Sequence, residues 1–322
     1  MSFKKMISAL SIFCALHVSA QNNDLSVANG TIKFNSYDTY ESYANNPGTQ
    51  DAIRTLATGS DAVTTLLEAG NTSEDDVPLF LQSVLNTDNV FSIGNYLIKI
   101  DLPNNRALVI NSSVANSYTD LVNNNTGSAS MIVMSDDEQN AIEVLKAIDN
   151  GTLSIADYNN ATPELRFRWP WNRCSGAHRY TQKSHPVDLW DHGTDPASSC
   201  PDQSVLYGAD DKAVYQKFIF YFSLESKMKS LRACSSTNWI LVPTYKAFMA
   251  LSGTVKFVKV NACSDEYNNS RDDSGVGTVM SWRPYEGSHA LTKYDFTIDF
   301  SIKHTWETTF HGPFHYHIMD GY

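Results

Sequence analysis

The sequence is poor in charged residues, has no cluster of Lys and Arg, and contains no long hydrophobic run after its first 20 residues. Charged residues make up 18% of the 322 residues, and the formal net charge is −11. Because contacts to nucleic-acid phosphates need clustered cations, this composition argues against a nucleic-acid partner. A membrane-spanning helix needs about 20 consecutive apolar residues, and no later segment approaches that length. We therefore expect a globular protein without a transmembrane segment.

Several motifs of common enzyme classes are also missing. The sequence contains no Gly-x-Ser-x-Gly elbow, no His-Glu-x-x-His, no P-loop and no Gly-x-Gly-x-x-Gly fingerprint. Catalytic triads, however, are defined by geometry and not by order in the sequence. The sequence alone therefore leaves enzymatic activity undecided.

The first 20 residues have the pattern of a signal peptide. Lys4 and Lys5 precede an apolar run over 6–16, and Val18, Ser19 and Ala20 supply the small residues of a cleavage site. The run is too short to cross a bilayer as a helix. We predict cleavage after residue 20 and export to the periplasm or the cell exterior.

Four cysteines follow the predicted signal peptide, all in the second half of the chain. They are Cys174, Cys200, Cys234 and Cys263. An even number of cysteines in an exported chain favours disulfides, here two bonds with three possible connectivities. A Cys174–Cys200 pair would close a loop rich in His and Asp. The competing interpretation is a metal site, for which the spacing of Cys174, His178 and His185 is not specific.

Charge and tryptophan content divide the chain into two parts. Residues 21–160 carry 5 Lys and Arg against 18 Asp and Glu, whereas residues 161–322 carry 17 of each kind and all six Trp. The segment from Asn150 to Pro163 has turn-forming residues and no long apolar periodicity. We predict an acidic domain at 21–150, a linker at 151–163 and a second domain at 164–322.

The first domain is expected to mix helices and strands. Apolar spacing predicts helices over 60–70 and 77–86, and strands over 90–93, 96–100, 107–110 and 131–134. Ser135 and Glu138 match a capping box, which predicts a further helix ending near Gly151.

The second domain is expected to be antiparallel β. Apolar and polar residues alternate over 214–225 and over 294–303, and further strands are predicted over 238–248, 253–262 and 277–282. A phase change between Phe257 and Val258 predicts a β-bulge. Because each strand has one apolar face, we expect a two-layer β-sandwich. The predicted fold class is α+β, with a small mixed domain followed by this sandwich.

Two segments resemble exported, mostly uncharacterised two-domain proteins of Bacteroidota. The first runs from Phe80 to Asn86 and on through Val90 to Ile100, where a helix ending in Leu-Asn precedes an Ile-Gly-x-x-hydrophobic-hydrophobic-Lys strand. The second runs from Tyr221 to Leu231 and includes Trp239 and Tyr245-Lys246 beyond it. The resemblance implies export from a Gram-negative cell and brings no catalytic residue with it.

The histidines near the C-terminus are the most specific candidates for a functional site. His311, His315 and His317 lie close together, and on a strand His315 and His317 share one side while Phe314, Tyr316 and Ile318 share the other. Two imidazoles spaced in this way can bind one divalent metal if a third ligand, such as His311, is present. The alternative is a pair of solvent-facing polar residues near a chain end.

A second group of candidate residues lies in an expected long loop. His185, Asp188, Asp191 and His192 have side chains suited to acid–base work or metal binding. The same residue types are common in ordinary turns. A third segment, the acidic run over 265–273, is expected to be a solvated loop, because its spacing does not match a calcium-binding motif.

The sequence therefore predicts an exported protein that acts by binding. We expect the ligand, a glycan or a protein, on the loops or on an exposed sheet face of the second domain. One alternative is a metal-dependent hydrolase that uses the histidine clusters of that domain, and another is a purely structural component of the envelope or cell surface.

Overall fold

The computed structural model describes residues 24–46, 50–60, 62–70, 72, 77–166, 169–170, 174, 181–184, 188–194, 204–233, 239–241, 247–304 and 308–322. The predicted signal peptide lies outside these residues. The chain forms two compact units, one made of 1–101 and 108–132 and the other of 102–107 and 133–322. The described residues contain no helix long and apolar enough to span a membrane.

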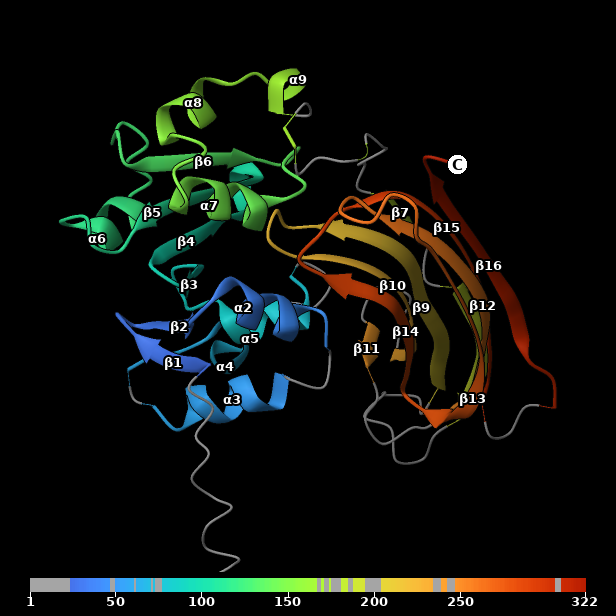
Figure 1. Cartoon of the computed structure of the whole chain (residues 1–322). Helices are drawn as coiled ribbons and strands as arrows, with labels where there is room; N and C mark the ends of the chain where they lie inside the picture. The colour runs from blue at the N-terminus through green and yellow to red at the C-terminus, as the bar shows by residue number, and fades with distance from the viewer. Residues whose placement is uncertain are drawn as a thin grey trace, which may run out of the picture. The chain divides into compact units, whose positions relative to one another are not determined.

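A six-stranded sheet, sheet 1, organises the first part of the chain (Figure 1). Its strands, in spatial order, are β1 (Leu25–Ala28), β2 (Thr31–Phe34), β3 (Val90–Ile93), β4 (Tyr96–Asp101), β5 (Arg106–Asn111) and β6 (Met131–Ser135). β2 and β3 are parallel, whereas the β1–β2 and β3–β4 pairs are antiparallel. The four strands predicted between residues 90 and 134 are confirmed as β3 to β6.

Short helices accompany this sheet. They are α2 (Tyr37–Ala44), α3 (Gln50–Thr58), α4 (Leu66–Ala69), α5 (Leu79–Val84), the 3₁₀ helix η2 (Leu102–Asn104), α6 (Ser117–Val122), α7 (Ala141–Asp149), α8 (Ile155–Asn160) and α9 (Pro163–Arg166). The core of the first unit is aromatic: the ring of Tyr40 lies 5.1 Å from Phe34, 6.0 Å from Phe80 and 5.6 Å from Phe91. The helix predicted over 77–86 is confirmed as α5, which begins directly after Pro78.

Two helix starts differ from the prediction. α4 begins after Thr65 and not after Ser60, because Thr65 and Glu68 form the capping box. α7 begins after Asn140, since the carboxylate of Glu138 accepts hydrogen bonds from the backbone N–H groups of Gln139 and Asn140. Glu138 also accepts a hydrogen bond from the hydroxyl of buried Tyr158 at 2.8 Å. Tertiary packing of Glu138 therefore displaces the predicted capping box.

The segment predicted to be a linker, 151–163, is largely helical. Its helix α8 is capped by Ser154, whose hydroxyl accepts from the backbone N–H of Asp157. Tyr158 is buried, and the guanidinium of Arg166 lies 4.4 Å from its ring. The position of the domain junction itself stays a prediction.

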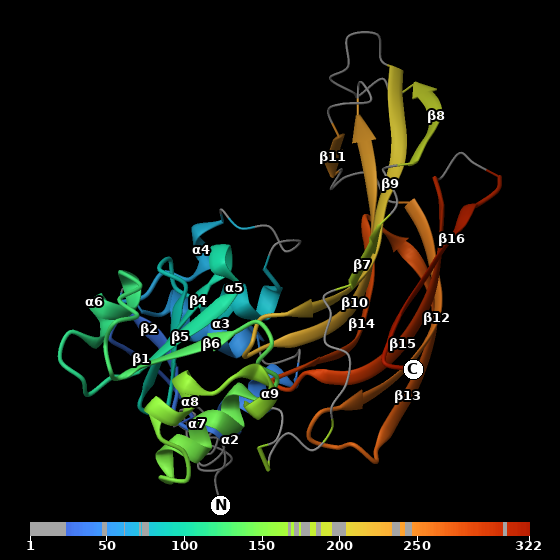
Figure 2. The ribbon, with the colours of Figure 1, turned by 90° about the horizontal axis from the view of Figure 1, so that it is seen from above.

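The second unit contains two further sheets. Sheet 2 has the order β11-β10-β9-β7, with β14 also paired to β10 and β8 to β9, and sheet 3 has the order β13-β12-β15-β16. The strands are β7 (Thr181–Ser184), β8 (Asp188–Thr194), β9 (Ser204–Lys217), β10 (Phe222–Ala233), β11 (Trp239–Leu241), β12 (Ala247–Lys259), β13 (Glu266–Gly277), β14 (Val279–Gly287), β15 (Leu291–Lys303) and β16 (His311–Asp320). Figures 1 and 2 show their long, curved ribbons.

Sheets 2 and 3 share one apolar core, which confirms the predicted antiparallel β-sandwich and the α+β fold class. The ring of Tyr215 in β9 lies 4.8 Å from that of Tyr294 in β15, and Trp282 in β14 lies 5.5 Å from Phe296 in β15. β15 alternates buried and half-exposed residues along most of its length, as its sequence predicts. The β12–β15 ladder does shift register near the predicted position, between Val258 and Lys259, but the extra residue is Thr292 on β15 and not a residue of the strand for which the bulge was predicted.

The alternation over 214–225 does not form one strand. The chain reverses at Phe218–Tyr221, so that β9 ends at Lys217 and β10 begins opposite it at Phe222. Within this turn Phe218 N–H donates to the Tyr221 carbonyl at 2.8 Å, and Ile219 adopts a positive φ of 64°. The turn contains no Gly, Pro, Asn or Asp, and three of its four residues, Ile219, Phe220 and Tyr221, are buried. Local sequence therefore carries no turn signal here.

The acidic run over 265–273 is largely a strand and not a loop. It forms most of β13, which is an edge strand of sheet 3 and is exposed on both faces. Charged residues on edge strands oppose pairing with other chains. Because neither face of β13 is buried, its sequence lacks the apolar alternation that identified other strands of this domain.

Cys174 and Cys263 form a disulfide across 89 residues of sequence. The predicted use of cysteines in disulfides is thus confirmed for this pair, and the Cys174–Cys200 alternative is wrong. Cys200 and Cys234 lie outside the described residues.

Candidate functional site

The side of sheet 3 that faces away from the shared core is a regular surface built from three neighbouring strands, β12, β15 and β16. We call it the outer face. Its members are Phe248, Ala250, Ser252, Thr254 and Lys256 on β12, Lys293, Asp295, Thr297, Asp299, Ser301 and Lys303 on β15, and His315, His317 and Met319 on β16. Residues at the intervening positions, such as Leu251, Ile298 and Tyr316, are buried. The outer face follows directly from the two-residue period of strands with one buried side.

Two histidine–aspartate pairs lie in the middle of the outer face. Nδ1 of His315 lies 2.7 Å from Oδ1 of Asp299, and Nε2 of His317 lies 2.8 Å from Oδ1 of Asp295. The His315 and His317 side chains are 58% and 44% exposed, so water screens both pairs. The prediction that His315 and His317 share one side of a strand, opposite Tyr316 and Ile318, is confirmed.

Aromatic rings flank this polar region at both ends of sheet 3. At one end the ammonium group of Lys303 lies 5.4 Å from the ring centre of Phe248 and 5.1 Å from that of Phe310. Phe248 and Phe310 are 41% and 48% exposed, although phenylalanine is among the residue types that are most often fully buried.

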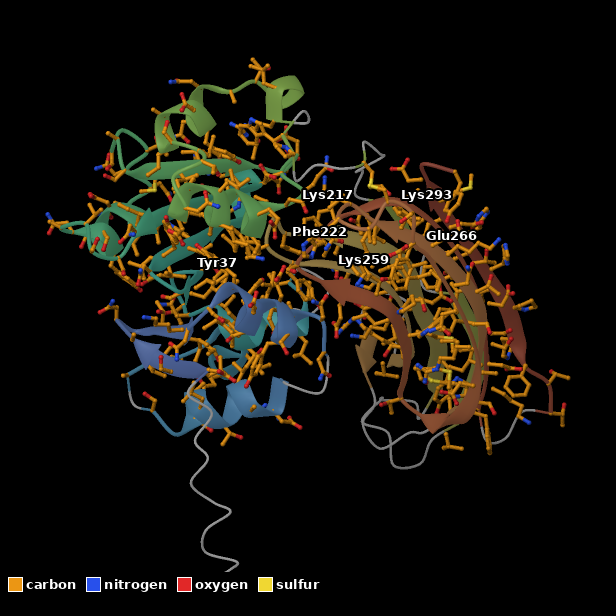
Figure 3. All side chains as sticks on the ribbon, in the orientation of Figure 1. Tyr37, Lys217, Phe222, Lys259, Glu266 and Lys293 are labelled. Atoms are coloured by element: carbon orange, nitrogen blue, oxygen red, sulfur yellow. A yellow bond between two sulfur atoms is a disulfide. The ribbon has the colours of Figure 1, made fainter. Side chains whose placement is uncertain are left out.

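At the other end Lys293 lies 4.2 Å from the ring centre of Tyr322. The ammonium group of Lys293 also lies 3.5 Å from the carboxylate of Glu266, and Figure 3 labels both residues. The Tyr322 hydroxyl donates to Glu266 at 2.7 Å. This hydrogen bond holds the pKa of Glu266 below its usual value, and Lys293 contributes in the same direction.

The third predicted histidine is set apart from the other two. His311 lies opposite Ile302, beyond a register shift that separates it from the Phe300–Phe314 pair. Among the described residues, His311, His315 and His317 do not place three ligand atoms within 4.8 Å of one another. Their joint role as metal ligands stays a prediction.

The expected long loop near residue 190 contains strands. Asp188, Asp191 and His192 lie in β8, which pairs with β9, and Asp191 is the extra residue of a bulge between Trp190 and His192. His185 lies outside the described residues. A ligand-binding role for these four residues stays a prediction, but three of them lie on a strand and not on a loop.

Sequence reasoning missed a buried ionic network that joins β10 to β14. The guanidinium of Arg283 lies 3.1 Å from the carboxylate of Glu225 and 3.5 Å from that of Glu286. The hydroxyl of Tyr221 donates to Glu286 at 2.5 Å. The side chains of Glu225 and Glu286 are 2% and 4% exposed.

Burial raises the pKa of Glu286, while the hydrogen bond from Tyr221 and the charge of Arg283 oppose that shift. Glu225 lies on β10, Arg283 and Glu286 lie on the neighbouring β14, and Tyr221 directly precedes β10, so the network joins the two strands. Glu225 occupies a polar position of the alternation over 214–225, where the sequence suggested solvent, whereas Arg283 and Glu286 lie beyond the strand predicted over 277–282.

Comparison with protein-family models, with curated proteins and with solved structures found no match. The resemblance to exported Bacteroidota proteins therefore stays an expectation. The outer face is the site from which a function has to be argued.

Proposed function

We propose that the protein acts by binding an extended glycan along the outer face of sheet 3. The observation that carries this proposal is the order of residues on that face. Exposed rings lie at both ends, and a strip of Asp, His, Ser and Thr side chains lies between them. Export of the protein, as the sequence predicts, would bring this face into contact with extracellular or envelope glycans.

The chemistry of this strip suits a hydroxyl-rich ligand. Carboxylates such as Asp299 accept hydrogen bonds, histidines and hydroxyl groups donate and accept them, and sugars carry hydroxyl groups that do both. Aromatic rings such as Phe248 and Phe310 offer apolar faces to the C–H side of a sugar ring. From Lys293 to Lys303, β15 spans about 33 Å at roughly 3.3 Å per residue, long enough for several linked sugars.

A protein ligand fits this arrangement less well. Protein interfaces typically have an apolar, aromatic centre surrounded by a polar rim. On the outer face the polar residues Asp299, His315 and His317 take the centre, and the rings take the ends. This reversed order favours the glycan.

The test is affinity electrophoresis of the mature protein through gels containing a panel of neutral and anionic polysaccharides. Oligosaccharides from any retaining polymer are then titrated calorimetrically. We expect retention by at least one polymer, and at least tenfold weaker binding for the F248A/F310A double variant and for D299N. The control is V279A, which removes an equally exposed apolar side chain from β14 in sheet 2.

Two results would contradict the proposal. One is retention by no polysaccharide, which would favour the protein ligand that the sequence left open. The other is equal retention of F248A/F310A and V279A, which would place any glycan site elsewhere on the chain.

A further inference from the structure

We propose that His315 and His317 form a binding site for a late transition-metal ion, Zn²⁺ or Cu²⁺, on the outer face of sheet 3. This inference does not depend on glycan binding. It rests on the placement of the two rings and on the carboxylate that orients each of them.

The strand places both imidazoles on one side. His315 and His317 are separated by one residue on β16, and Tyr316 between them points into the core. Side chains two residues apart on a strand lie about 6.6 Å apart at their bases. One ion with bonds of about 2.0–2.1 Å to each imidazole nitrogen can bridge this separation.

Each imidazole is held by an aspartate from the neighbouring strand. Asp299 lies directly opposite His315, and Asp295 reaches His317 diagonally across the β15–β16 ladder. Metal-binding histidines commonly donate their second N–H to a carboxylate in this way, which fixes the ring and makes the other nitrogen a better ligand.

The hydrogen bonds also determine which nitrogen would bind the ion. A carboxylate only accepts hydrogen bonds, so Nδ1 of His315 and Nε2 of His317 carry the hydrogens. In the neutral rings the lone pairs are then on Nε2 of His315 and Nδ1 of His317. His317 also takes part in a further interaction of the folded protein.

The local charge is compatible with a bound cation. Asp295 and Asp299 bring two carboxylates within hydrogen-bond distance of the two rings. Lys256 lies opposite Asp295 on β12, and its single positive charge opposes the two negative charges only in part. Imidazole is a ligand that Zn²⁺ and Cu²⁺ accept readily. With two protein ligands, the remaining coordination positions belong to water or to a group on a bound ligand.

The test is titration of the mature, full-length protein with ZnCl₂ and with CuSO₄ in a non-chelating buffer at neutral pH, in competition with a chromophoric chelator. We expect one ion per chain at this site. The H315A/H317A double variant should bind that ion at least tenfold more weakly. D299N keeps both imidazoles but weakens the hydrogen bond that orients His315, and we expect a loss of about tenfold, the lower end of the range for such outer partners.

Two measurements separate this site from other histidines of the chain. T254A changes a side chain on the same face that offers no imidazole, and it should bind as the unchanged protein does. In nuclear magnetic resonance spectra, substoichiometric Cu²⁺ should broaden the ring signals of His315 and His317 first. Loss of binding in H311A as well would add a third ligand and support the site. Absence of binding, or equal binding in the H315A/H317A variant, would overturn it.

Discussion

At the residue scale, burial decides which titratable groups make stability depend on pH. His289 lies in the short connection between β14 and β15 and is 8% exposed. Its Nδ1 lies 3.1 Å from the Ser288 hydroxyl, and its carbonyl accepts a hydrogen bond from the hydroxyl of Tyr285. Burial lowers the pKa of His289 from 6.5 to about 4, against the opposing charge of Glu143. The folded protein therefore holds this ring neutral in a range where the unfolded chain protonates it.

This shift predicts a loss of stability in mild acid. A group whose pKa is lower in the folded protein than in the unfolded chain contributes stability that is present above the unfolded value, here pH 6.5. That stability is lost as the pH falls toward 4. At 1.36 kcal/mol per pKa unit, His289 should account for roughly 3 kcal/mol of that loss. Urea unfolding of the protein and of His289→Gln over pH 4–7.5 measures it, because other titrating groups cancel in the difference. Parallel curves for the two proteins would show that His289 does not carry this effect.

At the element scale, close packing between sheets decides which residues a strand tolerates. Gly253 lies in the middle of β12, where a strand interior normally disfavours glycine. A Cβ at this position would lie 2.6 Å from Cδ1 of Ile298, 2.8 Å from the carbonyl oxygen of Thr297 and 2.9 Å from Trp282. A Cβ added at Gly275 in β13 would meet no atom within 4 Å. The glycine in β12 therefore makes room for the tryptophan of the facing sheet.

The two glycines should respond oppositely to the same substitution. Gly253→Ala forces a methyl group against a backbone oxygen and two buried side chains, and we expect it to destabilise the protein by about 1–3 kcal/mol. Gly275→Ala should be neutral or slightly stabilising, because it restricts the unfolded chain without a clash. Urea unfolding measures both. A Gly253→Ala protein as stable as Gly275→Ala would mean that the sheets do not approach as closely as described.

At the scale of the whole molecule, the Cys174–Cys263 disulfide joins distant parts of the second unit. The bond connects the segment before β7 to the segment before β13, across 89 residues. Closing such a long loop restricts the unfolded chain and thereby favours the folded state. The bond also agrees with the predicted export of the protein, since disulfides persist in oxidising compartments.

The disulfide leads to three predictions for protein exported from its native host. First, a peptide map without reductant should show the peptide of Cys174 linked to that of Cys263. Second, the two bonds predicted from the sequence require that Cys200 pairs with Cys234, because these are the two cysteines left after the signal peptide. Third, the C174S/C263S variant should lose about 2–5 kcal/mol of stability. Alkylation of Cys174 and Cys263 without reductant would contradict the first prediction, and alkylation of only Cys200 and Cys234 would contradict the second.

The sequence by itself determined the elements that bury apolar side chains. The alternation along β15 could be read directly, because a two-residue period follows from burial of one side. The short strands β3 to β5 are buried on both sides and could be read from their short apolar runs. The same reasoning placed His315 and His317 on one side of a strand. It failed for β13, which is exposed on both faces, and at Phe218–Tyr221, where the chain turns on buried apolar residues.

Only the tertiary structure decided what stands beside each residue. Asp299 and Asp295 precede His315 and His317 by 16 and 22 residues, and they meet because β15 and β16 pair in one register. The same holds for three other features: the pairing of Cys174 with Cys263, the network of Glu225, Arg283 and Glu286, and the rings at the ends of the outer face. Such contacts depend on strand order and register, which are set by the packing of whole sheets, and no local pattern of residues encodes them.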